Sequence, residues 1–149
     1  MEREPIPERA SQGFDPRLMK KAGYSPKAIQ YFAEQPNRGV LADANQVTEM
    51  AGPCGDSITI YLRVKEGRVD DARALVTGCP GAMVSAMAAM ELVKGKTLNQ
   101  ALAIEEKDIF RALEELPDEK QDCVQLCARV LHQAVEDYVC SGPSLSNRE

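Results

Sequence analysis

The residues of this 149-residue chain best suited to metal or sulfur chemistry are its five cysteines, since it has a single histidine. Cys54 lies in a predicted turn, Cys79 lies between a predicted strand and a predicted helix, and Cys123 begins another predicted helix. A helix N-terminus stabilises a thiolate, which favours Cys79 and Cys123 as ligands of zinc, copper(I) or an iron–sulfur centre. No Cys-X-X-Cys pair occurs, so a metal site must join distant segments. The alternative for each cysteine is a small buried hydrophobic residue.

The composition restricts the class of protein. With 44% hydrophobic and 28% charged residues, the chain is expected to form one compact domain. It has no apolar run of the ~18 residues that a membrane span requires. The formal net charge of −5 argues against nucleic acid partners. The odd number of cysteines and the lack of a signal or transit segment predict a reduced, cytoplasmic protein.

Hydrophobic periodicity predicts a mixture of strands and helices. From Ser57 to Lys65 apolar and polar residues alternate, as in a strand with one buried face. Glu66-Gly67 connects this strand to a second one over Val69 to Thr77, so the two are expected to pair as a hairpin. The further elements expected are a weak strand over Val47 to Met50 and helices from Pro26 to Pro36, Ala82 to Val93, Thr97 to Ala103, Glu105 to Glu115 and about Asp122 to Val139.

Several motifs taken together resemble those of a known family. They are Cys54-Gly55-Asp56 after a proline, Asp70-Asp71-Ala72-Arg73 leading to Gly78-Cys79, Val93-Lys94-Gly95-Lys96-Thr97-Leu98, and Leu116-Pro117 seven residues before Cys123. From Tyr24 to about Tyr138 the chain is similar to the iron–sulfur cluster assembly scaffolds of the IscU type, which are also found as the N-terminal domain of NifU. The cysteine separations of 25 and 44 residues resemble those of this family, without the longer insertion of the SufU branch.

The resemblance implies an α+β fold of the IscU/SufE type. Such a fold has a small antiparallel sheet of about three strands with helices packed on one face, and the predicted hairpin supports it. Residues 24–140 would form the scaffold domain, residues 1–23 a flexible N-terminal extension and residues 141–149 a disordered tail.

The resemblance also implies a scaffold function rather than an enzymatic one. Cys54, Cys79 and Cys123 would receive persulfide sulfur and iron and hold a labile [2Fe-2S] cluster, which then passes to acceptor proteins. Asp56 stands where the family has its cluster-labilising aspartate, because a carboxylate is a harder and weaker partner than a thiolate for sulfide-bridged iron. The alternative for Asp56 is a solvated turn aspartate that caps its own backbone.

The identity of the fourth ligand is open between several residues. In the family a histidine usually precedes the third cysteine, but Asp122 stands there in this chain. Asp122 is either an oxygen ligand or the N-cap of the last helix. His132 lies nine residues after Cys123, about half a turn away around the helix, so it is expected at the surface.

Two further cysteines follow the third one. Cys127 lies one helical turn after Cys123, where the family more often has a small apolar residue. It either faces the site as a spare ligand or persulfide relay, or packs in the apolar stripe of the last helix. Cys140 matches nothing in the family, and we expect it to take no part in the site.

The partners implied are a cysteine desulfurase and iron–sulfur acceptor proteins. Many relatives carry the segment Leu-Pro-Pro-Val-Lys, which an Hsp70-type chaperone binds. In this chain the corresponding segment is Leu116-Pro117-Asp118-Glu119-Lys120. An apolar groove would have to desolvate the two acids, which disfavours that chaperone as a partner. Lys120 either lies near the cluster site or is an ordinary solvated lysine. Whether the domain forms a homo-oligomer is left open.

A zinc-bound sulfur acceptor that stimulates a cysteine desulfurase, as in the SufU branch, is the alternative function. Zinc accepts the same thiolates and carboxylate in a closed tetrahedral site. The absence of the SufU insertion weighs against this alternative. A plain thiol redox protein is disfavoured because the chain has no closely spaced cysteine pair.

Overall fold

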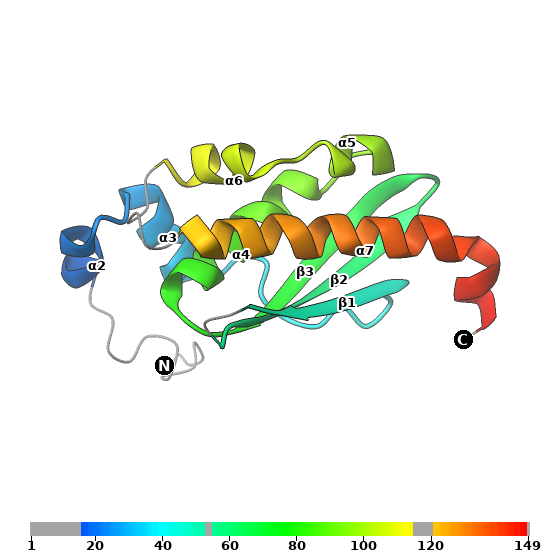
Figure 1. Ribbon diagram of the computed structural model, residues 1–149, viewed down its shortest axis with the longest axis horizontal. Helices are drawn as coiled ribbons and strands as arrows, with labels where there is room; N and C mark the ends of the chain where they lie inside the picture. The colour runs from blue at the N-terminus through cyan, green and yellow to red at the C-terminus, as the bar shows by residue number, and fades with distance from the viewer. Residues whose placement is uncertain (1–15, 53–54, 115–120, 149) are drawn as a thin grey trace.

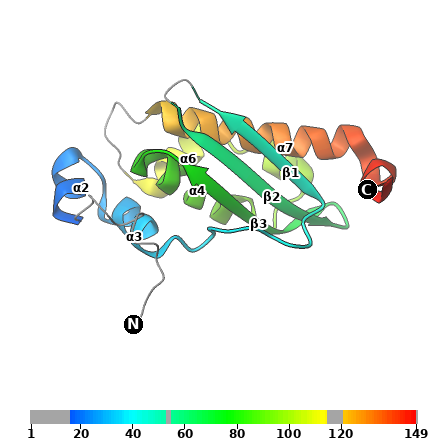
Figure 2. The same cartoon turned by 90° about the horizontal axis from the view of Figure 1, so that it is seen from below.

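A three-stranded antiparallel sheet forms one layer, and two helices cover one of its faces (Figures 1 and 2). The structure is a computed structural model that describes residues 16–52, 55–114 and 121–148. Helix α4 packs on β3, and helix α7 packs on β1 and β2. The elements are α2 (Pro16–Ala22), α3 (Pro26–Glu34), β1 (Gln46–Ala51), β2 (Ser57–Lys65), β3 (Arg68–Thr77), α4 (Pro80–Val93), α5 (Leu98–Leu102), α6 (Glu106–Leu113) and α7 (Gln121–Arg148).

The sheet confirms the predicted strands and hairpin. Its order is β1-β2-β3, and the alternating side chains of β2 are buried against the helices on one face and half-buried on the other. Lys65 pairs with Arg68, so Glu66 and Gly67 form a two-residue turn. Both turn residues have positive φ, 53° and 77°, which matches the right-handed twist of a hairpin and favours glycine. The α+β fold with helices on one face is confirmed.

Helix α4 forms the centre of the core. Every residue from Pro80 to Met90 is buried, because α4 lies between β3 on one side and α3, α6 and α7 on the others. A helix that is apolar on all sides is suited to such a position. Helices α5 and α6 extend along α4 and α7 on the side away from the sheet, as Figure 1 shows.

Both ends of the described chain are helical. Residues 16–22, which fall in the predicted flexible extension, form α2, and Met19 is buried with the core at 3% exposure. The pattern also predicts an end of the last helix near Val139 and a disordered tail from 141, but α7 continues to Arg148. Extending an existing helix requires no new nucleation. Pro143 lacks a backbone N–H, and the last turns of α7 bend away from its axis (Figure 1).

No helix within residues 16–52, 55–114 and 121–148 combines the length and apolar character needed to cross a bilayer. Helix α7 is long enough, but polar and charged side chains recur along it.

Ser25 joins two helices of the domain through one hydroxyl group. Its side chain accepts a hydrogen bond of 2.9 Å from the backbone N–H of Ala28 and so caps α3, and it donates to the carbonyl of Leu113 at the end of α6. We expect Ser25→Ala to lower the free energy of unfolding by about 2 kcal/mol, since it removes a cap and leaves a buried carbonyl unsatisfied. Urea denaturation followed by circular dichroism measures this change.

Ser57→Ala is the matched control. The Ser57 hydroxyl donates to the carboxylate of Glu49 at 3.0 Å in an exposed position. Loss of such a surface contact should change stability by less than about 0.5 kcal/mol. Equal effects of the two variants would contradict the role given to Ser25.

Candidate metal centre

Three segments that are far apart in the sequence meet at one end of the sheet. Asp56 comes immediately before β2, and Cys79 comes two residues after the end of β3. Ser57 pairs with Thr77 in the antiparallel register, so the start of β2 and the end of β3 are adjacent. Cys123 lies in the first turn of α7, whose N-terminus reaches the same end of the sheet. The topology therefore brings one carboxylate and two thiols together.

The donor atoms of these residues are close enough to surround one metal ion. The Sγ atoms of Cys79 and Cys123 are 3.5 Å apart, and Oδ2 of Asp56 lies 3.7 Å from the first and 3.8 Å from the second. Two thiolates bound to a tetrahedral zinc at about 2.3 Å would lie about 3.8 Å apart. The spacing therefore fits zinc or a similar ion held by two sulfur atoms and one oxygen.

The three donors differ in exposure, and two of them lie at helix N-termini. Asp56 and Cys123 are buried, at 8% and 5% exposure, whereas Cys79 is half-buried. Cys79 is the N-cap residue of α4, and Cys123 lies in the first turn of α7. The free N–H groups and dipoles of two helix N-termini therefore face a group of acidic side chains, which offsets part of their mutual repulsion.

Cys54, the third cysteine predicted as a ligand, lies outside the described residues, and so does Lys120, which is predicted either near the site or as a solvated lysine. Asp122 is exposed in the first turn of α7, which begins at Gln121, and it is not part of the Asp56, Cys79 and Cys123 group. There its carboxylate interacts favourably with the helix dipole.

Cys127 is a core residue directly behind the group. It is fully buried, and its Sγ lies 3.9 Å from the carbonyl oxygen of Ala82 in α4. Burial raises the pKa of the Cys127 thiol, and the negative charges of Cys79 and Asp56 raise it further. The neutral thiol is therefore the stable form, which favours the packed alternative over a ligand.

The remaining histidine and cysteine lie away from the group. His132 does not have the surface position that the helical spacing predicts: it is half-buried, and its Nε2 contacts the carbonyl of Ile104 between α5 and α6. The segment between α5 and α6 covers this side of α7, which the spacing along α7 alone does not show. Cys140 is exposed, more than four helical turns after Cys123.

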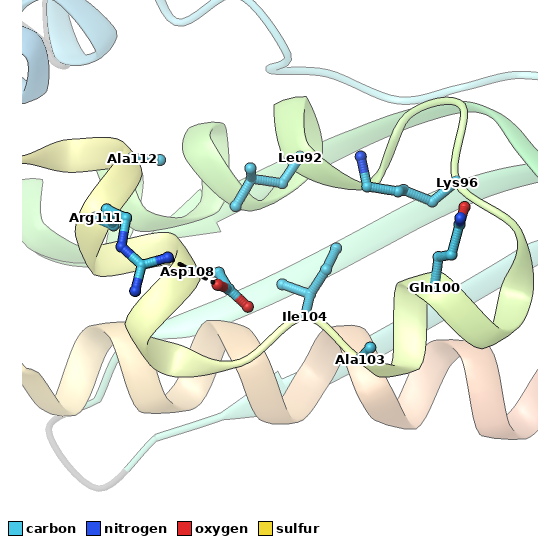
Figure 3. A pocket seen from close by; sticks show the side chains of 8 residues that line it. All are labelled: Leu92, Lys96, Gln100, Ala103, Ile104, Asp108, Arg111 and Ala112. Carbon is cyan, nitrogen blue, oxygen red and sulfur yellow. Dashed lines mark hydrogen bonds and ion pairs between the residues drawn. The ribbon is translucent and has the colours of Figure 1, made fainter.

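A cavity of about 510 Å³ lies between α4 and helices α5 and α6 (Figure 3). Leu92, Ile104 and Ala112 give it a largely apolar lining, with Lys96 and Arg111 among its polar residues. None of the cysteines described in the structure lines it. The metal-ligating chemistry is therefore at the end of the sheet and not in this cavity.

Comparison with known sequences shows the family to which the chain belongs. Residues 23–142 match the family model of the NifU-like N terminal domain. An iron–sulfur cluster assembly scaffold protein IscU of Archaeoglobus fulgidus is 38% identical over 116 residues, which cover 77% of this chain and 76% of that protein. The iron–sulfur cluster assembly scaffold protein IscU of Escherichia coli K12 is 37% identical over 120 residues, with 77% of this chain and 93% of that protein covered.

Solved structures share the fold at lower sequence identity. The N-terminal part of a NifU-like protein from Brucella abortus superposes with a TM-score of 0.64 at 17% identity, covering 83% of this chain and 99% of that chain. A putative iron–sulfur cluster assembly scaffold protein for the SUF system from Fervidobacterium islandicum gives a TM-score of 0.61 at 20% identity, with 75% and 96% covered. These likenesses concern the fold alone.

The position of Cys127 predicts a thiol that does not react in the folded protein. The thiolate is the nucleophile in alkylation, and Cys127 is both buried and protonated, whereas Cys140 is exposed. At pH 8 we expect iodoacetamide to modify Cys127 at least about 100-fold more slowly than Cys140. Mass spectrometry of proteolytic peptides, with fragmentation to separate Cys127 from Cys123, measures both rates.

Unfolding supplies the control for this comparison. In concentrated urea the two cysteines should react at similar rates, because burial no longer distinguishes them. Similar rates in the native protein would show that Cys127 is accessible and would contradict its placement in the core.

Proposed function

This chain belongs to the NifU-like N terminal domain family, and on that premise we propose that it is an iron–sulfur cluster assembly scaffold. It accepts persulfide sulfur and iron, builds a labile [2Fe-2S] cluster and passes the cluster to acceptor proteins. The observation that carries this proposal is the meeting of Asp56, Cys79 and Cys123 within 4.8 Å of one another at the junction of three segments.

Thiolates and a carboxylate suit a site that both builds and releases its cargo. Cys79 and Cys123 bind iron strongly as soft ligands, and Cys54 is the third thiolate of the proposed set. Asp56 supplies a harder oxygen donor, which makes one corner of the cluster exchangeable. A half-buried position at the end of a sheet gives sulfur donors and acceptors access to Cys79.

We propose that the chain itself is not an enzyme and only accepts sulfur from one. A thiolate of the site attacks the outer sulfur of a desulfurase persulfide, so the S–S bond of the donor breaks and a new one forms on the scaffold. The proposed partners are therefore a cysteine desulfurase and iron–sulfur acceptor proteins. Reduced thiols are needed for this step, which fits a cytoplasmic location. The segment proposed for the chaperone, residues 116–120, lies outside the described residues.

A zinc-bound sulfur acceptor would use the same donors. The spacing of Asp56, Cys79 and Cys123 fits zinc as well as iron, so we expect zinc to occupy the site when protein is isolated without added iron. This second function differs from the first in its outcome: zinc is retained, the desulfurase is stimulated and no cluster forms.

Anaerobic reconstitution with ferrous iron, cysteine, a cysteine desulfurase and a thiol reductant, which reduces the persulfide sulfur to sulfide, tests the scaffold function. We expect the wild-type protein to develop the visible absorption of a [2Fe-2S] cluster, with iron and sulfide bound in equal amounts. The triple variant Cys54→Ala, Cys79→Ala, Cys123→Ala should lose this absorption, because it retains no thiolate ligand.

Cys140→Ala is the matched control, since it removes an exposed thiol distant from the group. It should form the cluster as the wild type does. A cluster that survives in the triple variant would overturn the scaffold proposal. Persistent zinc in the wild type, with a stimulated desulfurase and no cluster, would establish the zinc-bound sulfur acceptor instead.

A further inference from the structure

We infer that Gly78 is a positioning residue that holds the Asp56 carboxylate at the metal-binding group. Gly78 has no side chain to bind metal itself, and it acts through the space that it leaves for Asp56. This inference rests on the proposed function, because it concerns the same site, but it assigns a role to a residue outside the set of ligands.

The space beside Gly78 is filled by the side chain of Asp56. A Cβ atom on residue 78 would lie 2.7 Å from Cγ of Asp56, 3.0 Å from its Cβ, and closer still to Oδ1. Real Cβ atoms essentially never approach another atom closer than 3.0 Å, as this one would approach Cγ and Oδ1, so one of the two residues would have to move. Gly78 also has φ of +150°, in the region that favours glycine.

Asp56 is held on its other sides as well. The backbone N–H of Gly52 donates to the carbonyl oxygen of Asp56 at 2.8 Å, which anchors the main chain. The backbone N–H of Cys79 donates to Oδ1 at 3.3 Å, which orients the carboxylate. Because Asp56 is also 92% buried, its side chain has little freedom to relocate without losing these contacts.

The two carboxylate oxygens therefore have different roles. Oδ1 accepts the hydrogen bond from the backbone N–H of Cys79 and fills the space that a Cβ atom on residue 78 would need, whereas Oδ2 lies 3.7 Å from Sγ of Cys79 and 3.8 Å from Sγ of Cys123. The residue presents one oxygen to a metal and retains the other in a backbone hydrogen bond. A side chain at position 78 would push the carboxylate away and take Oδ2 out of the group.

A double-mutant cycle on Co²⁺ binding tests this coupling. The variants are Gly78→Ala, Asp56→Ala and the double variant, and the probe is Co²⁺ alone, titrated anaerobically through its visible thiolate absorption. If Gly78 acts by positioning Asp56, Gly78→Ala should weaken Co²⁺ binding about 10- to 100-fold in the wild-type background. In the Asp56→Ala background the same substitution should cause no further loss.

Gly67→Ala is the control for backbone strain. Gly67 also has positive φ, 77°, but a Cβ atom there would meet nothing within 4 Å, and it lies in the turn at the opposite end of the hairpin. This variant should lose stability through strain alone and bind Co²⁺ as the wild type does.

Urea denaturation keeps the test valid if Gly78→Ala folds poorly. Asp56→Ala removes the two atoms that a new Cβ would meet most closely, so adding it to Gly78→Ala should raise the unfolding midpoint. Equal losses of Co²⁺ affinity in both backgrounds, or no recovery of the midpoint, would overturn the inference. Neither result depends on cluster formation, so failure of the scaffold function would be seen separately, in the reconstitution of the wild-type protein.

Discussion

The pairing of Ser57 with Thr77 is the constraint on which the site depends. The register of an antiparallel hairpin is set by its turn and by which face of each strand is buried. The two-residue turn at Glu66 and Gly67, together with the register shift between Arg63 and Val64, places Ser57 opposite Thr77, so the residues just beyond the open end of the hairpin are neighbours. Asp56 and Cys79 occupy that position, and a slip of one residue would send the buried side chains of β2 to the opposite face.

The core supports this arrangement by fixing two helix N-termini at the open end of the hairpin. Helix α4 begins directly after Cys79 and is buried along most of its length, so its start cannot shift without disturbing the core. Helix α7 packs on α4 and on the sheet, and this packing places Sγ of Cys123 3.5 Å from Sγ of Cys79. The partial positive charges of both helix ends lower the cost of gathering acidic groups there.

Much of the fold was predictable because it depends on local patterns. The alternation in β2 and the Glu66-Gly67 turn are each set by a few neighbouring residues, and both are present. The placement of His132 was not predictable from its own helix, because the covering segment comes from elsewhere in the chain. The end of α7 also differs from the sequence pattern, which places it near Val139, whereas the helix continues to Arg148.

The sequence by itself determined the chemistry that is available: soft thiols and a carboxylate at the ends of regular elements, in motifs that resemble those of a scaffold family. Only the tertiary structure decided which of these groups meet, because distances between segments depend on strand register and helix packing. It joins Asp56 to Cys79 and Cys123, leaves Asp122 exposed and encloses Cys127 in the core. It also shows what glycine at position 78 does, because the side chain of Asp56 fills the space that a Cβ atom there would need.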